Sequence, residues 1–216
     1  MSVDPSGSVP ALEAEPAAAA VVFGERIDVA RAFTASLAEH GEERGLIGPL
    51  ELPRLWNRHV LNSAVIAPLF RGSVADIGSG AGLPGLVLAI ARPDVHWTLI
   101  EPMERRVAWL NEQVDELGLD NVEVVRARAE DWRGGPVFDA VTARAVSALR
   151  TLLPLTAPLV RDGGELILLK GANAQAEIGA AEKQLRKYKV SDARAEIVGE
   201  GVIAEPTRVI RARVRA

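Results

Sequence analysis

Four glycines lie close together after an apolar run in the first half of the chain. Residues 74–86 read VADIGSGAGLPGL, with glycines Gly78, Gly80, Gly82 and Gly85. Since glycine loses more conformational entropy on folding than any other residue, this density requires a physical reason. A glycine turn between a strand and a helix lets the backbone approach a ligand at the carboxyl end of a parallel sheet. The stretch therefore predicts a ligand-binding loop.

The spacing of the glycines distinguishes between kinds of ligand. A dinucleotide fingerprint would require a glycine where the chain has Leu83, and a phosphate-binding P-loop would require a Gly-Lys-Ser/Thr ending, which is missing. The pattern that fits is acid-x-Gly-x-Gly-x-Gly, from Asp76 to Gly82, which is typical of S-adenosylmethionine loops. We expect Asp76 either to hold this loop or to meet the ammonium group of the cofactor.

Two later acids extend the predicted cofactor site. Glu101 ends the run VHWTLIE, 19 residues beyond Gly82, where a carboxylate can accept hydrogen bonds from the ribose diol. After the third strand, Ala129 and Glu130 are expected beside the adenine, where a backbone amide and an acid can bind the edge of the base. Alternatively, Glu130 and Asp131 only cap a short helix.

The elements around these residues predict an α/β fold. Short β-branched runs alternate with longer amphipathic ones from Ser73 onward, which favours a parallel sheet with helices on both faces. We predict strands at 73–77, 95–101, 122–126, 137–142 and 164–170, and helices at 83–91, 103–117, 147–160 and 173–188.

The end of the chain has a different texture. Two strand-like runs, 194–199 and 207–214, are joined only by a loop, so they can pair as an antiparallel hairpin at the edge of the sheet. Rossmann-type methyltransferases end in this way. We therefore predict a Rossmann-like class I S-adenosylmethionine-dependent methyltransferase fold, in which a mostly parallel sheet carries an antiparallel C-terminal hairpin.

The first third of the chain lacks this alternation. Residues 1–18 have little to bury and are expected to form a disordered leader. Two apolar-periodic stretches, about 21–39 and 52–69, predict a helical N-terminal extension over 19–70. The methyltransferase domain should then span 71–216.

Composition excludes several classes of protein. The 216 residues are 48% apolar and can bury one core, and no apolar run is long enough to span a bilayer, so we expect a soluble cytoplasmic protein without a membrane partner. The chain has no cysteine, which excludes thiolate metal sites and covalent catalysis by a thiolate. The net charge of −4 leaves room for a polyanionic partner on one basic face.

Three local strings carry a resemblance to a known family. They are NRHVLNS (57–63), DIGSGAGLPG (76–85) and VTARAVSAL (141–149). Together with the order of loop, spacing and tail, they make residues 25–215 resemble the bacterial ribosomal small-subunit methyltransferase G family, also called glucose-inhibited division protein B.

The resemblance implies methyl transfer from S-adenosylmethionine to nitrogen 7 of one guanine in 16S ribosomal RNA, either free or within the 30S subunit. It implies cofactor contacts at five residues, which are Gly78, Leu83, Ala129, Glu130 and Arg144. The family commonly has a serine before that arginine, whereas this chain has Ala143. We expect a monomer that requires no metal.

The implied chemistry suits the residues that are present. Nitrogen 7 of guanine keeps a free lone pair at neutral pH, so methyl transfer requires no general base and depends on proximity and alignment. An arginine can hydrogen-bond the guanine oxygen or a phosphate, and Arg144 follows an apolar strand at the rim of the site. We predict that Arg144 is the catalytic contact, with a surface ion pair as its alternative role.

Other basic residues are candidates for holding RNA. Arg126 and Arg128 share a strand face and either bind phosphate or remain exposed edge charges, and Lys170 ends the fifth strand in a similar position. His59 is expected to be a hydrogen-bonded interface histidine. A basic run is also present near the C-terminus and makes either a phosphate-binding patch at the active-site rim or a solvated face; it comprises Lys183, Arg186, Lys187, Lys189, Arg208, Arg211, Arg213 and Arg215.

Two other functions are compatible with the same residues. A methyltransferase of this fold could act on a small molecule or a protein, because fold alone does not determine function. A non-catalytic RNA-binding module could retain the glycine loop without using it. Both remain open at the level of sequence.

Overall fold

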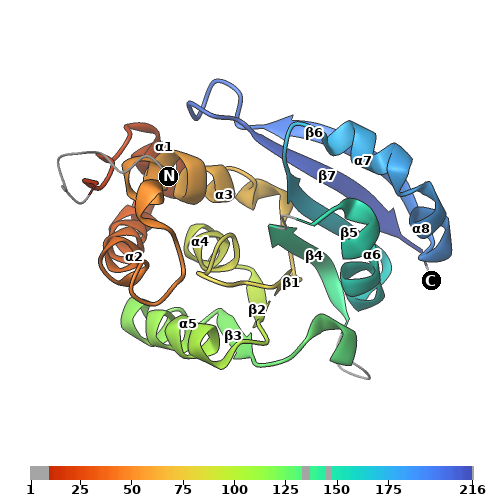
Figure 1. The fold of residues 1–216 in the computed structure, drawn as a ribbon, viewed down its shortest axis with the longest axis horizontal. Helices are drawn as coiled ribbons and strands as arrows, with labels where there is room; N and C mark the ends of the chain where they lie inside the picture. Colours follow the sequence, from red (N-terminus) through yellow and green to blue (C-terminus); the bar gives the residue numbers. More distant parts are fainter. Residues whose placement is uncertain (1–9, 133–136, 145–146, 216) are drawn as a thin grey trace.

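A computed structural model describes residues 10–132, 137–144 and 147–215 of the chain. One seven-stranded sheet forms its centre (Figure 1). Its strands are β1 (Ser73–Ile77), β2 (His96–Ile100), β3 (Val122–Val125), β4 (Phe138–Arg144), β5 (Val160–Lys170), β6 (Val190–Val198) and β7 (Thr207–Val214).

The order of the strands is β3-β2-β1-β4-β5-β7-β6. The first five strands pair in parallel, whereas β7 pairs antiparallel with both β5 and β6. The predicted fold class and its C-terminal hairpin are therefore confirmed. The chain runs outward from β1 to β3 and then returns to β4 on the other side of β1. The sheet accordingly has its topological switch point between β1 and β4, where open α/β sheets bind ligands.

The fifth strand begins earlier than the sequence predicts. Residues 160–163 join the strand although Gly163 and Gly164 lie within it, and the register with β4 shifts between Phe138 and Ala140. Gly163 has a φ of +73°, a backbone conformation that side chains disfavour. Glycine here permits an irregularity in the strand, whereas the strand predicted from the sequence began only at residue 164.

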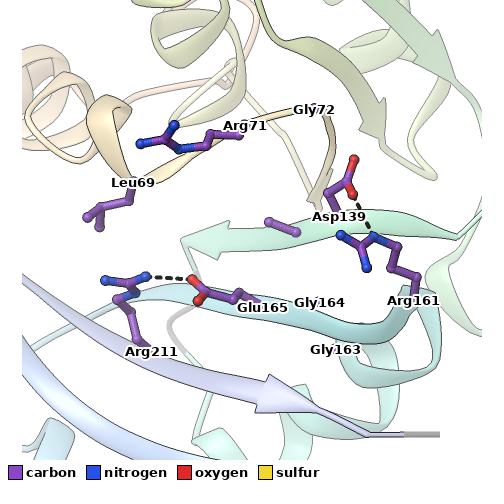
Figure 2. A pocket seen from close by; sticks show the side chains of 10 residues that line it. Leu69, Arg71, Gly72, Asp139, Arg161, Gly163, Gly164, Glu165 and Arg211 are labelled. Carbon is purple, nitrogen blue, oxygen red and sulfur yellow. Dashed lines mark hydrogen bonds and ion pairs between the residues drawn. The ribbon is translucent and has the colours of Figure 1, made fainter.

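A cavity of about 390 Å³ lies beside this irregularity, at the end of the sheet where β1 and β4 begin (Figure 2). Two ion pairs line it, Arg161 with Asp139 at 2.6 Å and Arg211 with Glu165 at 2.6 Å. Asp139 also accepts hydrogen bonds from the backbone N–H and the hydroxyl of Ser73. These contacts join strands β1, β4, β5 and β7 at the end of the sheet opposite the glycine loop.

Helices cover both faces of the sheet, with α1 to α5 on one side and α6 to α8 on the other (Figure 1). The helices are α1 (Ala18–Phe23), α2 (Ile27–His40), α3 (Asn62–Ala64), α4 (Gly85–Ala91), α5 (Glu104–Leu117), α6 (Leu149–Thr156), α7 (Ala174–Ala180) and α8 (Glu182–Lys187). Among the described residues, no helix combines the length and apolarity that crossing a membrane would take.

Two predicted helices are broken in the structure. The stretch 52–69 contains a π-helix, Leu55–Leu61, followed by α3, and the stretch 173–188 divides into α7 and α8 at Ala181. A π-helix adds a residue to the turn and is frequent at functional sites. Here it turns Arg58 and His59 toward the end of β4, as described below.

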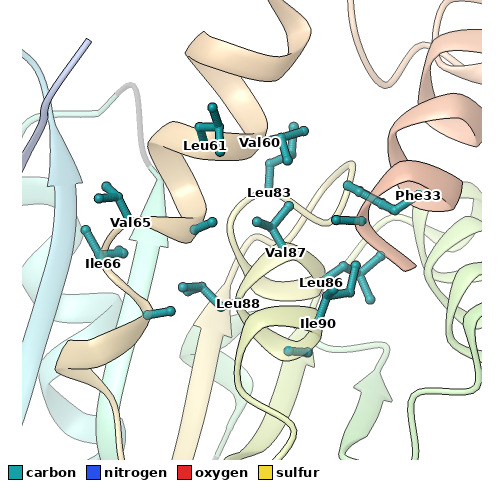
Figure 3. Close-up of a cluster of buried hydrophobic side chains, with 14 of the residues drawn as sticks. Phe33, Val60, Leu61, Val65, Ile66, Leu83, Leu86, Val87, Leu88 and Ile90 are labelled. Carbon is teal, nitrogen blue, oxygen red and sulfur yellow. The ribbon is translucent and has the colours of Figure 1, made fainter. Parts of the chain in front are cut away.

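The helical extension and the sheet share one hydrophobic core (Figure 3). Phe33 of α2 and Val60 of the π-helix are fully buried together with Leu86 and Val87 of α4. Leu83, which the resemblance implies as a cofactor contact, has its side chain in this cluster and is 4% exposed. Any contact between Leu83 and the cofactor must therefore come from its backbone.

Part of the expected leader has partners in the folded extension. The backbone N–H of Glu13 donates to the carbonyl oxygen of Leu52 at 2.9 Å, and its carboxylate accepts from the N–H of Asn57 at 3.0 Å. Glu15 pairs with Arg31 at 2.6 Å. The expectation of disorder is thus wrong for residues 10–18, because their acids find partners that composition does not reveal; residues 1–9 lie outside the described part.

Candidate functional site

The four glycines of the loop have two different physical roles. A Cβ atom at Gly82 would collide with the side chain of Leu86, and one at Gly85 would collide with Leu99 and Asp76. These two glycines allow α4 to pack closely on β1 and β2. Gly78 and Gly80 instead have φ values of +71° and +57°, and a Cβ atom at either position would meet no atom closer than 3.7 Å. Open space beside backbone of this kind suits a closely approaching ligand.

Asp76 is completely buried beneath the loop. Its Oδ2 accepts a hydrogen bond from the N–H of Gly85 at 3.0 Å, while its Oδ1 has no hydrogen-bond partner among the described residues. Burial raises the pKa of Asp76 to about 7, and the hydroxyl of Ser79, the N–H of Gly85 and the charge of Arg144 oppose this shift; the Ser79 hydroxyl itself donates to the backbone carbonyl of Asp76 at 3.0 Å. A buried acceptor without a donor is costly in a native structure. An ammonium group of a bound cofactor would supply the missing donor.

The raised pKa of Asp76 has a consequence for folding. Since the folded state holds the proton more tightly than the unfolded chain, stability falls as the pH rises from about 4 to about 7. The cost of ionising Asp76 is then fully present above pH 7, on the order of 4 kcal/mol for a shift of this size. A cation bound at Oδ1 would offset part of this cost.

Glu101 supports the loop from the neighbouring strand. Its Oε2 accepts from the N–H of Gly80 at 3.0 Å and its Oε1 from the N–H of Met103 at 2.9 Å, and the residue is 1% exposed. Each carboxylate oxygen has a second lone pair, so these bonds leave capacity for a ribose hydroxyl. The role of Glu101 toward the ribose stays a prediction, and its contact with Gly80 is a further role that the sequence did not suggest.

A cavity of about 260 Å³ lies beside the loop, over the ends of β1 and β2. It is lined by three predicted cofactor contacts, Gly78, Ala129 and Glu130, and by apolar side chains that include Ile77 and Ile100. Ala129–Asp131 forms a short 3-10 helix after β3. The structure therefore places Ala129 and Glu130, which the sequence assigned to the adenine side, beside Gly78 and the ends of β1 and β2, and an apolar cavity with one acid at its edge fits an adenine.

Arg144 ends β4 on the other side of the switch point. Its guanidinium donates to Nδ1 of His59 at 2.9 Å, and Nε2 of His59 contacts Glu51 at 2.6 Å. Burial lowers the pKa of Arg144, with the charges of Asp76 and Glu51 acting in the opposite direction. Arginine remains a cation in proteins, so Arg144 can donate hydrogen bonds but not remove a proton. The interface role expected for His59 is confirmed.

A second cavity, of about 500 Å³, extends from Arg144 along the ends of three adjacent strands. Arg144, Lys170 and Arg208 follow one another across β4, β5 and β7, since Arg144 pairs in register with Leu169 and Lys170 with Arg208. We call this space the basic cavity; its lining also includes Arg58, His59, Asn62, Leu169, Gly171, Glu205 and Pro206. Three arginines, Arg58, Arg144 and Arg208, against one carboxylate make it suited to a polyanion, whereas the charge of Lys170 is paired with Glu177.

The predicted RNA contacts differ in their positions. Lys170 lines the basic cavity, but its side chain is 2% exposed and is held by the carbonyl oxygen of Ser147 at 2.6 Å and by Glu177 at 2.7 Å. Arg128 lines the cavity on the adenine side, and Arg126 pairs with Glu104 at 3.0 Å. Contact of these three residues with RNA stays a prediction.

The basic run near the C-terminus does not form one patch at the rim. Of these basic residues, only Arg208 lies at the end of the sheet that carries the glycine loop, because β7 runs antiparallel to β5. Arg213 pairs with Glu165 toward the opposite end of the sheet. The start of β6, which follows α8, lies at that same opposite end. The expectation that Lys183 to Lys189 end near the active-site rim is therefore wrong.

Sequence reasoning missed three residues of the basic cavity, Arg58, Asn62 and Glu205. They come from the π-helix, from the start of α3 and from the loop before β7, and the amide of Asn62 donates to the carbonyl oxygen of Glu205 at 3.3 Å. The local signal for them was weak, although Arg58 and Asn62 lie within the NRHVLNS string that carried the resemblance.

The fold and the site together define a class of enzyme. An acid-x-Gly-x-Gly-x-Gly loop at the switch point of a sheet with this strand order defines a class I S-adenosylmethionine-dependent methyltransferase. A family model described as GidB, rRNA small subunit methyltransferase G, matches residues 26–204. The chain belongs to this family, and the resemblance drawn from its sequence is confirmed.

Relatives cover nearly the whole chain. The ribosomal RNA small subunit methyltransferase G of Leifsonia xyli subsp. xyli (strain CTCB07) is 70% identical over 205 residues, which cover 94% of this chain and 98% of that protein. The protein of the same name from Clavibacter michiganensis subsp. michiganensis (strain NCPPB 382) is 63% identical over 204 residues, with coverages of 94% and 97%.

Solved structures support the fold. The structure of P. horikoshii TYW2 in complex with MeSAdo has a TM-score of 0.57 at 16% identity and covers 73% of this chain and 62% of that one. The N-methyltransferase NodS from Bradyrhizobium japonicum WM9, in complex with S-adenosyl-L-homocysteine, has a TM-score of 0.52 at 14% identity, with coverages of 74% and 86%. At these identities the likeness concerns the fold alone.

The open space beside Gly80 can be tested by filling it. We expect Gly80→Val to abolish binding of S-adenosylhomocysteine, measured by calorimetry, because the side chain would occupy the space left for the ligand. Gly118→Val is the matched control, since Gly118 ends α5 with a φ of +59° and also has open space around it. Both variants carry a backbone strain of about 1–2 kcal/mol. Equal affinity in the two variants would show that the loop is misassigned.

The raised pKa of Asp76 makes cofactor binding dependent on pH. An ammonium group at Oδ1 favours the ionised carboxylate, so we expect the affinity for S-adenosylhomocysteine to rise by roughly 10-fold between pH 5.5 and 7.5. Calorimetry near pH 6.5, in two buffers of different ionisation enthalpy, should show proton release on binding. In Asp76→Asn both effects should disappear, and the same pH dependence in that variant would contradict the assignment.

Proposed function

We propose that this chain transfers a methyl group from S-adenosylmethionine to nitrogen 7 of one guanine in 16S ribosomal RNA. The observation that carries the proposal is the basic cavity, which contains Arg144 at the switch point together with Arg58 and Arg208. The family to which the chain belongs provides the substrate class.

The residues fit the cofactor and the reaction. Asp76, Gly78, Glu101, Ala129 and Glu130 would hold S-adenosylmethionine, which supplies a methyl group activated by its sulfonium. Nitrogen 7 of guanine already has a free lone pair, so no side chain has to remove a proton. The protein contributes alignment and the exclusion of water, which together can account for several kcal/mol of the barrier.

Arg144 would contact the substrate in this arrangement. It lies at the switch point between the loop and the basic cavity and can donate to the guanine oxygen or to a neighbouring phosphate. Arg58 and Arg208 lie in the same cavity and would hold the RNA backbone. The partner is then 16S RNA or the 30S subunit, met by a monomer in the cytoplasm.

Methyl transfer from labelled cofactor tests the proposal. The protein is incubated with assembled 30S subunits, with naked 16S RNA or with a metabolite extract, and labelled nucleosides are separated after digestion. We expect label in 7-methylguanosine from one of the two RNA substrates, and a loss of at least about 100-fold in turnover for Arg144→Ala. Lys187→Ala, on α8 far from the cavity, serves as the control and should keep wild-type turnover.

Two results would contradict the proposal. Label that enters only small molecules would favour the alternative substrate class. Full turnover of Arg144→Ala on its RNA substrate would refute the role of this arginine.

A further inference from the structure

A chain of three side chains connects the helical extension to the end of β4. Glu51 contacts Nε2 of His59 at 2.6 Å, and Nδ1 of His59 contacts the guanidinium of Arg144 at 2.9 Å. His59 and Arg144 are 85 residues apart in sequence. The side chain of His59 is 13% exposed, so the ring is largely removed from water.

The chemistry of the two outer groups determines the state of the ring. Arginine has five N–H donors and no acceptor, so Nδ1 of His59 must present a lone pair to Arg144. The Glu51 carboxylate accepts hydrogen bonds, so Nε2 must carry the proton. Both contacts are satisfied only by a neutral imidazole with its proton on Nε2. A protonated ring would direct an N–H toward a guanidinium N–H and would lose this contact.

We propose that His59 is a positioning residue for methyl transfer, whose neutral ring, protonated on Nε2, holds the guanidinium of Arg144 in the basic cavity and releases it when the ring becomes charged. The role of His59 in methyl transfer rests on the proposed function, whereas the contact itself does not. His59 touches neither the glycine loop nor the adenine-side cavity and acts through Arg144.

The charges around the ring support this state. The charged groups that act on His59 are Glu51, Arg58 and Arg144, and Lys170, Glu205 and Arg208 share its cavity. Arg54 pairs with Glu51, and Asp76 acts on Arg144. Burial lowers the pKa of His59. The hydrogen bond to Glu51 raises it, and the charge of Arg144 lowers it further. The ring of His59 is therefore mostly neutral at neutral pH, and lowering the pH converts it to the charged imidazolium.

The geometry also indicates why Arg144 requires such a partner. It is the last residue of β4, so the sheet fixes its backbone but not the end of its long side chain. The other charge that acts on it from the sheet is Asp76, which is itself partly protonated near pH 7. His59 supplies an acceptor whose position is set by the π-helix.

Nitrogen-15 NMR of histidine-labelled protein tests the contact without any substrate. The chain has three histidines, His40, His59 and His96, and His59→Gln assigns the signal. We expect His59 to be neutral at pH 7.5 with its proton on Nε2, to have a pKa below the ordinary value of histidine, and to titrate at higher pH in Arg144→Gln. A proton on Nδ1, a charged ring at pH 7.5 or an unchanged titration in Arg144→Gln would overturn the proposal.

The pH dependence of turnover tests the role in the reaction. At saturating cofactor and RNA, wild-type kcat should fall as the pH drops through the titration of His59 observed by NMR. His59→Gln should lower kcat on the order of 10-fold at pH 7.5, keep the cofactor KM within about 2-fold, and lose the acidic fall. His96→Gln is the matched control and should keep the wild-type profile.

A retained acidic fall or full kcat in His59→Gln would overturn the positioning role. Failure of the proposed function has a different signature, because the wild-type protein would then methylate neither RNA substrate at any pH, while the NMR result would still decide whether His59 holds Arg144.

Discussion

The structure depends on the carboxylate of Asp76, which is fully buried in the core of the sheet. Asp76 lies one residue before the end of β1 at the switch point of the sheet, and one of its oxygens fixes the start of α4 through the N–H of Gly85. Its other oxygen has no donor within the described part of the chain. Proteins are stable by only about 5–15 kcal/mol, so an unpaired buried acid is retained only if it has a function. We propose that its function is to receive the cationic end of the cofactor.

The glycines follow from the same constraint. Asp76 can reach the N–H of Gly85 only because that residue has no side chain, and Gly82 lets Leu86 pack beside it. Gly78 and Gly80 then remain as the part of the loop that faces open space, and Glu101 holds Gly80 from the next strand. Packing thus accounts for two glycines and ligand access for the other two.

Much of this arrangement could be predicted from the sequence. The alternation of strands and helices, the hairpin, and Gly78, Ala129 and Glu130 of the adenine-side cavity follow from local patterns, because a strand, a turn and a helix are each encoded by neighbouring residues. The basic cavity could not be predicted in the same way. Arg58 and Glu205 line one cavity because the loop before β7 packs against the extension, where Asn62 contacts Glu205, and no local pattern predicts that packing.

Local sequence patterns also could not predict which side chains pair with one another. Lys170 has the position of a phosphate contact at the end of β5, yet Glu177 of α7 and the carbonyl oxygen of Ser147 occupy its ammonium group. The expected disorder of residues 10–18 was wrong for the same reason, since Glu13 and Glu15 have partners far along the chain. Charge and composition describe a residue alone, whereas its partner depends on the complete fold.

A crystal structure of the protein with S-adenosylhomocysteine tests the central claim most directly. The account predicts that the ammonium group is hydrogen-bonded to Oδ1 of Asp76, directly or through one water, with the adenine in the cavity beside Ala129 and Glu130. A ligand bound elsewhere, or an Oδ1 still without a donor in the complex, would contradict it.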